Sequence, residues 1–184
     1  NETNDAEAVA KAVKLVHYGE ADILMKGNVG TATLLKGVLN KEWGLRKNEV
    51  ISHIALFEVQ AYHHKLISLT DVAMNIAPDL NTKIGIINNS VEFLRKLGIE
   101  TPKVAVLGAV ELVNESMPAT IDAALLSKMA ERGQIKDCII DGPLAFDNAI
   151  SAESAKHKGI KSIVAGDADL LLLPDIEAGN VLYK

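Results

Sequence analysis

The sequence predicts an α/β protein with a mostly parallel sheet. Short apolar runs alternate with longer amphipathic segments of helical period, which is typical of repeated strand–helix–strand units. Apolar residues make up 48% of the 184 residues and aromatic residues only 4%, which favours an aliphatic interior. The four consecutive leucines at 170–173 are long enough for one fully buried strand and too short to cross a membrane.

The first 47 residues are predicted to form a helix, a strand, a glycine loop and a second helix. Asn4 as N-cap, a valine stripe and a closing Gly19 predict the first helix over residues 4–18. The apolar run Ala21–Met25 predicts a strand that leads into the loop 26–31. A helix from Ala32 to Leu39 follows.

The pattern changes near residue 48, where we place a domain boundary. Apolar runs at 50–57 and 65–70 are close enough for a β-hairpin, with its turn around Tyr62, His63 and His64. The clearest helix begins at Pro78 and ends at Gly98. Beyond it we expect strands at 103–107, 138–141 and 162–165, and helices at 117–132 and 151–158.

Polar side chains cluster around the four-leucine strand. Asp169 precedes the strand, Pro174 ends it, and Asp175 and Glu177 suit the first turn of a following helix. Open α/β sheets bind their ligands at the carboxyl ends of strands, so this stretch is a candidate site. A buried strand followed by a capped helix explains the same residues without a ligand.

Composition excludes several classes of protein. A net charge of −5 and a pI near 5.5 argue against a nucleic-acid or membrane binder. No apolar run is long enough for a membrane span and no segment resembles a signal peptide, so we expect a soluble, cytoplasmic protein. Cys138 is the single cysteine, which rules out an internal disulfide and a cysteine-based zinc site; its apolar neighbours predict a core position.

The loop around residues 26–33 is a candidate anion site. Its glycines would let backbone N–H groups approach a phosphate at a helix N-terminus, while threonine hydroxyls and lysine charges add donors. The residues assigned to this candidate site are Lys26, Gly27, Gly30, Thr31, Thr33 and Lys36. The loop matches neither the dinucleotide fingerprint nor the Walker loop, and a plain strand-to-helix turn is the alternative.

Three carboxylates lie at or beyond the carboxyl ends of predicted strands and are candidates to line a cleft: Asp71, Asp141 and Asp147. Turn formation or helix capping explains each of them equally well.

A metal site is not expected. His53, His63 and His64 are poor candidates, because the adjacent His63 and His64 in a turn would point in different directions and no third ligand is spaced to complete a site with them. The spacing of Asp141, Asp147, Asp167 and Asp169 gives no support for a magnesium site. The sequence has no nucleophile elbow, and Cys138 has no visible partner base.

Several blocks together resemble the phosphate acetyl/butyryl transferase family, and its phosphate butyryltransferase branch most closely. The resemblance covers essentially the whole chain in order. The blocks are Met25-Lys26-Gly27 with Thr31, Ser52-His53, Thr70–Asn75, Ala77-Pro78, Pro102–Val106, Met117–Thr120, Ala130–Gly133, Asp141–Ala145 with Asp147, and Ala165–Lys184. The segment Asn28-Val29-Gly30 departs from the family pattern.

This resemblance implies a reversible transfer of a butyryl group between CoA and orthophosphate. It also implies an isocitrate/isopropylmalate dehydrogenase-like fold of two α/β domains with a cleft between them, and a homodimer or larger assembly. Residues 1–47 would belong to the first domain and 48–184 to the second. Acyl-CoA and phosphate would be the substrates, with no tightly bound cofactor, no metal and no nicotinamide.

The resemblance also assigns residues. The Lys26–Thr33 loop would hold phosphate or acyl phosphate, Lys36 would replace an arginine of acetyl-transferring relatives, and Asn180 would be a catalytic contact. The family's Ser-Arg pair and nearby aspartate lie beyond the segment that matches Gly179–Lys184. We therefore expect the chain, which begins at Asn1, to be an internal piece of a longer enzyme and to be inactive alone.

Two other enzymes and one non-enzyme remain as alternatives. An acyl-carrier-protein-dependent phosphate acyltransferase would suit the glycine loop but suits the later blocks poorly. A nicotinamide-dependent dehydrogenase would share the architecture. A non-catalytic domain of the same fold would bind CoA or phosphate without turnover. Preference for acyl chain length is not encoded in any pattern that we recognise.

Overall fold

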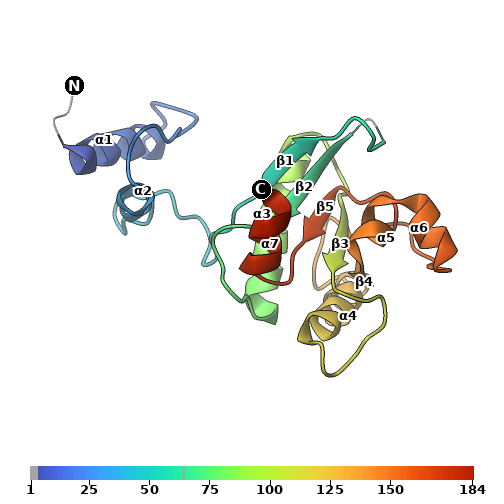
Figure 1. Cartoon of the computed structure of the whole chain (residues 1–184). Helices are drawn as coiled ribbons and strands as arrows, with labels where there is room; N and C mark the ends of the chain where they lie inside the picture. The colour runs from blue at the N-terminus through green and yellow to red at the C-terminus, as the bar shows by residue number, and fades with distance from the viewer. Residues whose placement is uncertain (1–3, 64) are drawn as a thin grey trace. The chain divides into compact units, whose positions relative to one another are not determined.

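The computed structural model of the chain describes residues 4–63 and 65–184 (Figure 1). The chain divides into two compact units, Asn1–Glu49 and Val50–Lys184, which we call unit 1 and unit 2 and describe separately. None of the described helices has both the length and the apolar character that crossing a membrane needs.

Unit 1 is built from two packed helices, α1 (Asp5–His17) and α2 (Thr31–Val38). Asn4 Oδ1 accepts a hydrogen bond from Ala6 N at 2.8 Å, which confirms the predicted N-cap. Val9 is buried in α1 against Gly37 of α2, where a Cβ would lie only 2.5 Å from Val9 Cγ1. The helices thus approach closely because Gly37 has no side chain.

The strand predicted at Ala21–Met25 is wrong. The segment has no regular secondary structure, and Ile23 and Met25 are 83% and 88% exposed. A strand needs a neighbouring strand to bond its backbone groups, and the described part of unit 1 contains none.

Unit 2 contains a five-stranded sheet in the order β1-β2-β5-β3-β4. Neighbouring strands are parallel except β1 and β2, which form an antiparallel hairpin. This confirms the mostly parallel sheet and the hairpin; the predicted turn residue His64 lies outside the described residues. The strands are β1 (Ala55–Glu58), β2 (Leu66–Thr70), β3 (Lys103–Leu107), β4 (Ile139–Leu144) and β5 (Leu170–Leu172).

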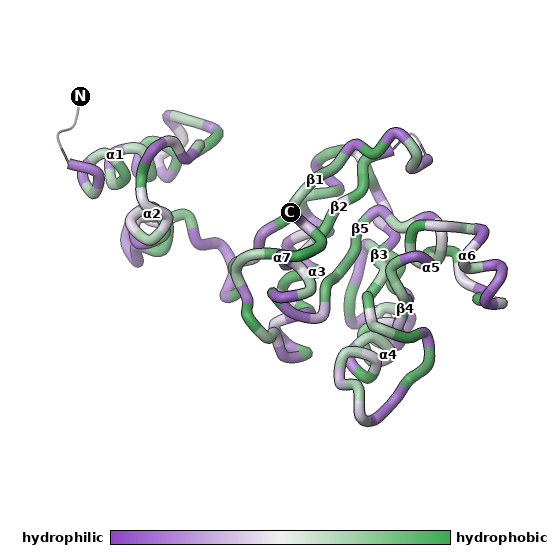
Figure 2. The backbone as a smooth tube through the Cα atoms, in the orientation of Figure 1, coloured by the Kyte–Doolittle hydropathy of each residue, from purple (hydrophilic) through white to green (hydrophobic). Residues whose placement is uncertain are grey.

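Helices pack on both faces of this sheet. One face carries α3 and α4, whose apolar side chains form a core with Leu170 and Leu172. The other carries a second core around Leu171, to which residues of α5 contribute. β5 therefore supplies leucines to both cores, as predicted for a fully buried strand, and the tube in Figure 2 is hydrophobic along β2 and β5. The helices are α3 (Leu80–Lys96), α4 (Pro118–Glu131), α5 (Phe146–Ile150), α6 (Ala152–His157) and α7 (Ile176–Tyr183).

Two further predictions need correction. Ser162–Ala165 is a turn and not a strand, because Ser162 Oγ accepts hydrogen bonds from Val164 N and Ala165 N that a strand would give to its neighbour. β4 continues to Leu144, beyond the predicted end at Asp141, and α5 follows it directly.

The order of the strands sets the position of their ends. The chain runs from β2 through α3 to β3, through α4 to β4, and then returns through α5 and α6 to insert β5 between β2 and β3. The four parallel strands end at the same edge, after Thr70, Leu107, Leu144 and Leu172, and we call this the carboxyl edge. The opposite edge is the amino edge.

Candidate functional site

The glycine loop of unit 1 ends at an uncapped helix N-terminus. Gly30 is the N-cap of α2, and no side chain accepts a hydrogen bond there. A Cβ at Gly27 would meet nothing within 4 Å, and one at Gly30 would meet only Thr33 Oγ1 at 3.7 Å. Local packing therefore does not require glycine at either position, whereas close approach of a ligand to the backbone would.

The charged members of this candidate site are exposed. Lys26 Nζ donates to Gly27 O at 3.2 Å, beside the loop. Lys36 lies in the last turn of α2, about 7.5 Å along the helix axis from Thr31. Five residues at about 100° each also turn Lys36 roughly 140° around the helix axis from Thr31, so these two side chains do not share a face of α2.

At the carboxyl edge of unit 2, Asp71 is saturated with hydrogen bonds. Its side chain is buried, with 3% of the residue exposed. Oδ1 accepts from the backbone N–H groups of His53, Ala73 and Met74 at 3.0–3.2 Å. Oδ2 accepts from Asn75 N at 3.0 Å and Asn75 Nδ2 at 2.5 Å. Asp71 thus shapes the loop that follows β2 and has little capacity left for a ligand.

The structure brings Asn180 next to this loop. Asn180 Nδ2 donates to Val72 O at 3.1 Å. One residue earlier, a Cβ on Gly179 would lie 2.6 Å from Asp71 O, so α7 packs here only because the position is glycine. Asp175 Oδ1 caps α7 by accepting from Ala178 N at 2.8 Å, so Asp175 is the N-cap, one position before the predicted first turn, and Glu177 lies in that turn as predicted.

The other two candidate carboxylates lie apart from this loop. Asp141 lies within edge strand β4, and its Oδ1 accepts from Gly142 N at 2.8 Å. Because β4 runs three residues further, Asp141 is not at the carboxyl edge as predicted. Asp147 is exposed in the first turn of α5, directly after β4.

A cluster of polar side chains connects the segments that follow β3 and β4. Asn148 is fully buried, and its Nδ2 donates to Glu111 Oε1 at 2.5 Å. Lys158 Nζ lies 3.4 Å from the same carboxylate oxygen. The loop after β3 is therefore fixed to α5 and α6 by polar contacts that the sequence pattern did not indicate.

Ion pairs at the amino edge hold the start of β5. Lys65 Nζ contacts Asp167 Oδ1 at 2.7 Å and Asp169 Oδ1 at 2.8 Å, and Lys103 Nζ contacts Asp167 Oδ2 at 2.5 Å. Partial burial acts to raise the pKa of the Asp167 carboxyl, but hydrogen bonds from Lys103 and Lys65 outweigh it and keep this pKa below its usual value. Burial, with the charges of both aspartates, raises the pKa of the Tyr62 hydroxyl, which donates to Ala168 O. Asp167 and Asp169 are thus structural ion-pair partners.

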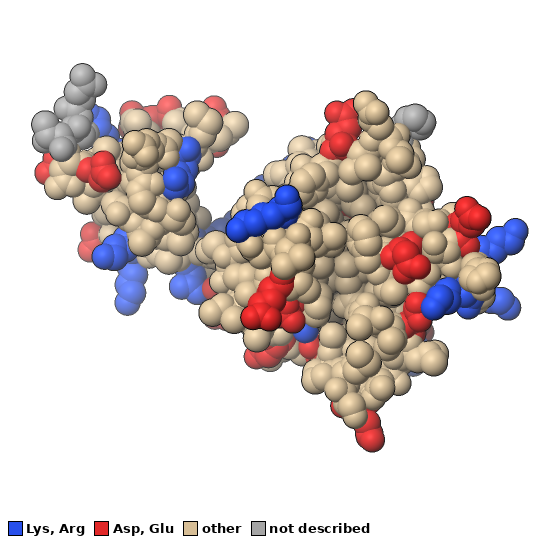
Figure 3. Space-filling view, in the orientation of Figure 1, with Lys and Arg blue, Asp and Glu red and all other residues tan. Residues whose placement is uncertain are grey.

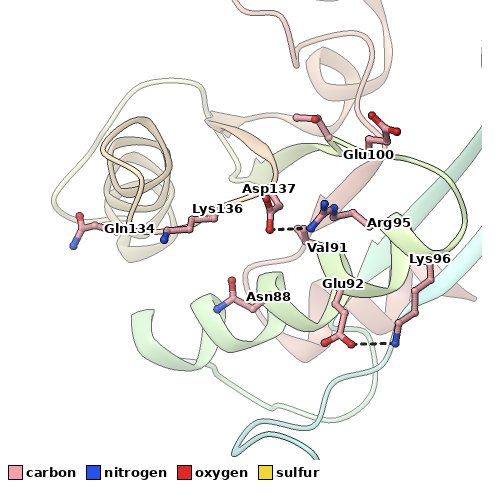
Figure 4. A pocket seen from close by; sticks show the side chains of 10 residues that line it. Asn88, Val91, Glu92, Arg95, Lys96, Glu100, Gln134, Lys136 and Asp137 are labelled. Atoms are coloured by element: carbon pink, nitrogen blue, oxygen red, sulfur yellow. Dashed lines mark hydrogen bonds and ion pairs between the residues drawn. The ribbon is translucent and has the colours of Figure 1, made fainter.

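A polar cavity of about 1070 Å³ also lies toward the amino ends of β3 and β4, between α3 and the segment that precedes β4 (Figure 4). Its six charged lining residues are three basic and three acidic, and ion pairs join four of them: Arg95 Nη1 contacts Asp137 Oδ2 at 2.9 Å, and Lys96 Nζ contacts Glu92 Oε1 at 3.0 Å. These pairs offset each other's charge, so the cavity is not selective for an anion.

An apolar groove of about 220 Å³ lies between the hairpin, α5 and α7. Phe57, Leu69, Phe146 and Leu182 are among its lining residues, and none of the lining residues is charged. Figure 3 shows this face, on which charged side chains lie mainly toward the periphery of unit 2. The groove is unsuited to phosphate.

The predicted metal and cysteine candidates are dispersed. His53 lies at the carboxyl edge, whereas His63 lies in the hairpin turn, with Nε2 2.7 Å from Gly166 O. Over residues 4–63 and 65–184, no three His, Cys, Asp or Glu side chains group closely enough to hold a metal ion. Burial, with a smaller contribution from Asp137, raises the pKa of the Cys138 thiol to about 11, so this thiol is a poor nucleophile at neutral pH.

Comparison with known proteins shows which family has this sequence and fold. The family model described as "Phosphate acetyl/butaryl transferase" matches residues 1–184. A phosphate butyryltransferase of Clostridium acetobutylicum is 56% identical over 184 residues, which cover 100% of this chain and 61% of that protein. A phosphate acetyltransferase of Thermotoga maritima is 50% identical over 178 residues, covering 97% of this chain and 60% of that protein.

A solved structure gives the same result. The crystal structure of a branched-chain phosphotransacylase from Enterococcus faecalis V583 matches with a TM-score of 0.91 and 40% identity, covering 100% of this chain and 65% of that one. The chain spans about three fifths of the length of the two sequence relatives. The family model covers every residue of the sequence. The chain therefore belongs to the phosphate acetyl/butyryl transferase family.

Proposed function

We propose that the full-length protein containing this chain transfers a butyryl group reversibly between CoA and orthophosphate, giving butyryl phosphate and CoA from butyryl-CoA and phosphate. The observation that carries this proposal is the 56% identity to a phosphate butyryltransferase over all 184 residues. A probable phosphate butyryltransferase of Bacillus subtilis is 53% identical over 182 residues. The acetyl-transferring relative is nearly as similar. The sequence identity therefore supports the acyl-transfer reaction more strongly than it supports a preference for the butyryl group.

The chemistry of this reaction needs oriented hydrogen-bond donors. In the direction of acyl-CoA synthesis, a CoA thiolate attacks the carbonyl of the acyl phosphate. Negative charge then grows on the carbonyl oxygen and on the leaving phosphate, and preorganised donors stabilise it. The uncapped N-terminus of α2, with Lys26, Thr31 and Thr33 beside it, supplies donors of this kind. We assign it to the phosphate or acyl-phosphate group.

The wider architecture follows from the same assignment. Residues 1–47 would belong to the first domain of an isocitrate/isopropylmalate dehydrogenase-like fold and residues 48–184 to its second, with the substrates bound in a cleft between them. Acyl-CoA and phosphate would be substrates without a tightly bound cofactor, in a cytoplasmic homodimer or larger assembly. The division of the chain between residues 49 and 50 supports this domain assignment.

The full-length protein is expected to release CoA thiol from butyryl-CoA only when orthophosphate is present. Thiol release with and without phosphate is the measurement, repeated with acetyl-CoA and a branched acyl-CoA to rank their kcat/KM values. Release without phosphate would indicate a thioesterase and contradict the proposal. Activity with acyl-carrier-protein thioesters but not CoA thioesters would support the carrier-protein enzyme instead. Binding of CoA without turnover would support a non-catalytic domain.

Lys26→Ala in the full-length protein is expected to raise the KM for phosphate roughly 10- to 100-fold, because a charged hydrogen bond contributes about 1.5–3 kcal/mol. Gly30→Ala should raise the same KM by placing a Cβ over the loop while leaving stability within about 0.5 kcal/mol. Lys41→Ala, which removes another exposed lysine of unit 1, is the matched control and should leave the KM unchanged. Equal effects of Lys26→Ala and Lys41→Ala on the KM for phosphate would contradict the assignment of phosphate binding to this loop.

A further inference from the structure

His53 is fixed at the carboxyl edge by its main chain. It lies just before β1, its N donates to Asp71 Oδ1 at 3.2 Å, and its carbonyl oxygen accepts from Thr70 Oγ1 at 2.8 Å. Two residues earlier, Ile51 O accepts from Asn75 Nδ2 at 2.9 Å. Thr70 and Asp71 are both buried, so this backbone has little freedom to move.

The two nitrogens of the His53 ring are in different surroundings. Nδ1 is buried and has no hydrogen-bond partner among the described residues. Nε2 also makes no hydrogen bond in the described part of the chain, but it is not among the fully buried unpartnered atoms, so part of it is accessible to solvent. The Tyr183 ring contacts the imidazole edge-to-face, with 5.5 Å between ring centroids, and limits rotation of the ring.

This difference selects one tautomer of the neutral imidazole. With the proton on Nδ1, a buried N–H donor would have no acceptor, which is a costly arrangement. With the proton on Nε2, the donor faces the surface and Nδ1 is left as an unpaired acceptor, which native structures tolerate more often. His53 therefore presents an Nε2–H donor at the carboxyl edge.

The neighbouring polar groups at this corner are already occupied. Asp71 accepts five hydrogen bonds, Thr70 Oγ1 donates to His53 O, and Asn180 Nδ2 donates to Val72 O. The Nε2–H of His53 is the ring donor that these contacts leave available. A carboxyl edge is where open α/β sheets bind their ligands.

We propose that His53 is a substrate-binding residue, and that its Nε2–H donates a hydrogen bond to an oxygen of the reacting group. This inference rests on the proposed acyl transfer, in which the thioester carbonyl oxygen and the phosphate oxygens are the acceptors that gain negative charge. Asp71 and Tyr183 are positioning residues for this donor, since each contacts His53 and neither has been placed on substrate.

Amide variants of His53 separate donation from structure. Gln places its amide nitrogen near the position of Nε2, whereas Asn places its amide nitrogen near the position of Nδ1. In the full-length protein, His53→Gln is expected to keep kcat/KM within about threefold and His53→Asn to lose roughly 10- to 100-fold, with equal thermal unfolding midpoints. His157→Asn, at an exposed position in α6, is the matched control and should be unaffected.

The kinetic split identifies the acceptor. A lower kcat with unchanged KM would indicate that Nε2–H donates to the carbonyl oxygen in the transition state. A higher KM for phosphate would indicate that it donates to a phosphate oxygen. Equal activity of His53→Gln and His53→Asn would overturn the proposal. A loss of activity in both variants that is explained by a lower unfolding midpoint would also overturn it.

Nitrogen-15 NMR of the wild-type imidazole tests the tautomer without any variant. A proton on Nε2 of the neutral imidazole supports the proposal, and a proton on Nδ1 overturns it. If the wild type has no phosphate-dependent thiol release, the proposed function fails, and the tautomer is still measured independently.

Discussion

Asp71→Asn is expected to lower the free energy of unfolding of the full-length protein by about 2–4 kcal/mol. The asparagine Oδ1 can still accept from the N–H groups of His53, Ala73 and Met74. Its Nδ2 replaces the oxygen that accepts from Asn75 N and Asn75 Nδ2, so donors meet donors in a buried position. Urea denaturation followed by circular dichroism measures the loss.

Asp147→Asn is the matched control for this substitution. Asp147 is also an aspartate at the carboxyl edge, but it is exposed in the first turn of α5. Its replacement is expected to change stability by less than about 0.5 kcal/mol. Equal small effects at both positions would show that the Asp71 carboxylate does not hold the loop.

Asp122→Leu is expected to lower the free energy of unfolding by about 3–5 kcal/mol, because it leaves the Lys83 ammonium buried without its partner. Lys83 Nζ lies 2.6 Å from Asp122 Oδ2, between α3 and α4, and the two side chains are 6% and 23% exposed. Lys83→Met should be less damaging, since the more exposed Asp122 can turn toward water.

The double variant Lys83→Met/Asp122→Leu tests the origin of that loss. If the unpaired charge causes it, two apolar side chains in place of the ion pair should recover most of the stability. Urea denaturation of the four proteins closes the double-mutant cycle. A double variant as unstable as the sum of the single variants would contradict this account.

Local signals in the sequence predicted most of the fold. Asn4 does cap α1. Gly98, which adopts a positive φ of 93°, directly follows the C-cap Leu97 and so does mark the end of α3. The strand prediction for Ala21–Met25 was wrong because an apolar segment becomes a strand only beside another strand. The strand prediction for Ser162–Ala165 was wrong because the Ser162 hydroxyl accepts hydrogen bonds from the backbone N–H groups of Val164 and Ala165.

The candidate site was less predictable because its contacts join residues far apart in the sequence. Asp71 was identified from its position after a strand and Asn180 from the family resemblance, but only the fold shows that both have hydrogen-bond partners in the loop after β2. His53 was considered only as a metal ligand. The block Ser52-His53 was a signal, but the burial of Nδ1 and the contact of the imidazole with the Tyr183 ring arise from the fold, which no local pattern reports.

The late insertion of β5 has a consequence for synthesis on the ribosome. β5 is translated after the other four described strands of this sheet, yet it lies in the middle, between β2 and β3. Until residue 172 has emerged, β2 and β3 have no strand between them, and the leucines that join the two cores are missing. The nascent chain can form the hairpin and the β3–α4–β4 unit early, but the sheet closes only near the end of translation of this segment. The unpaired edges of β2 and β3 are open to other chains during that interval, which exposes the nascent chain to aggregation.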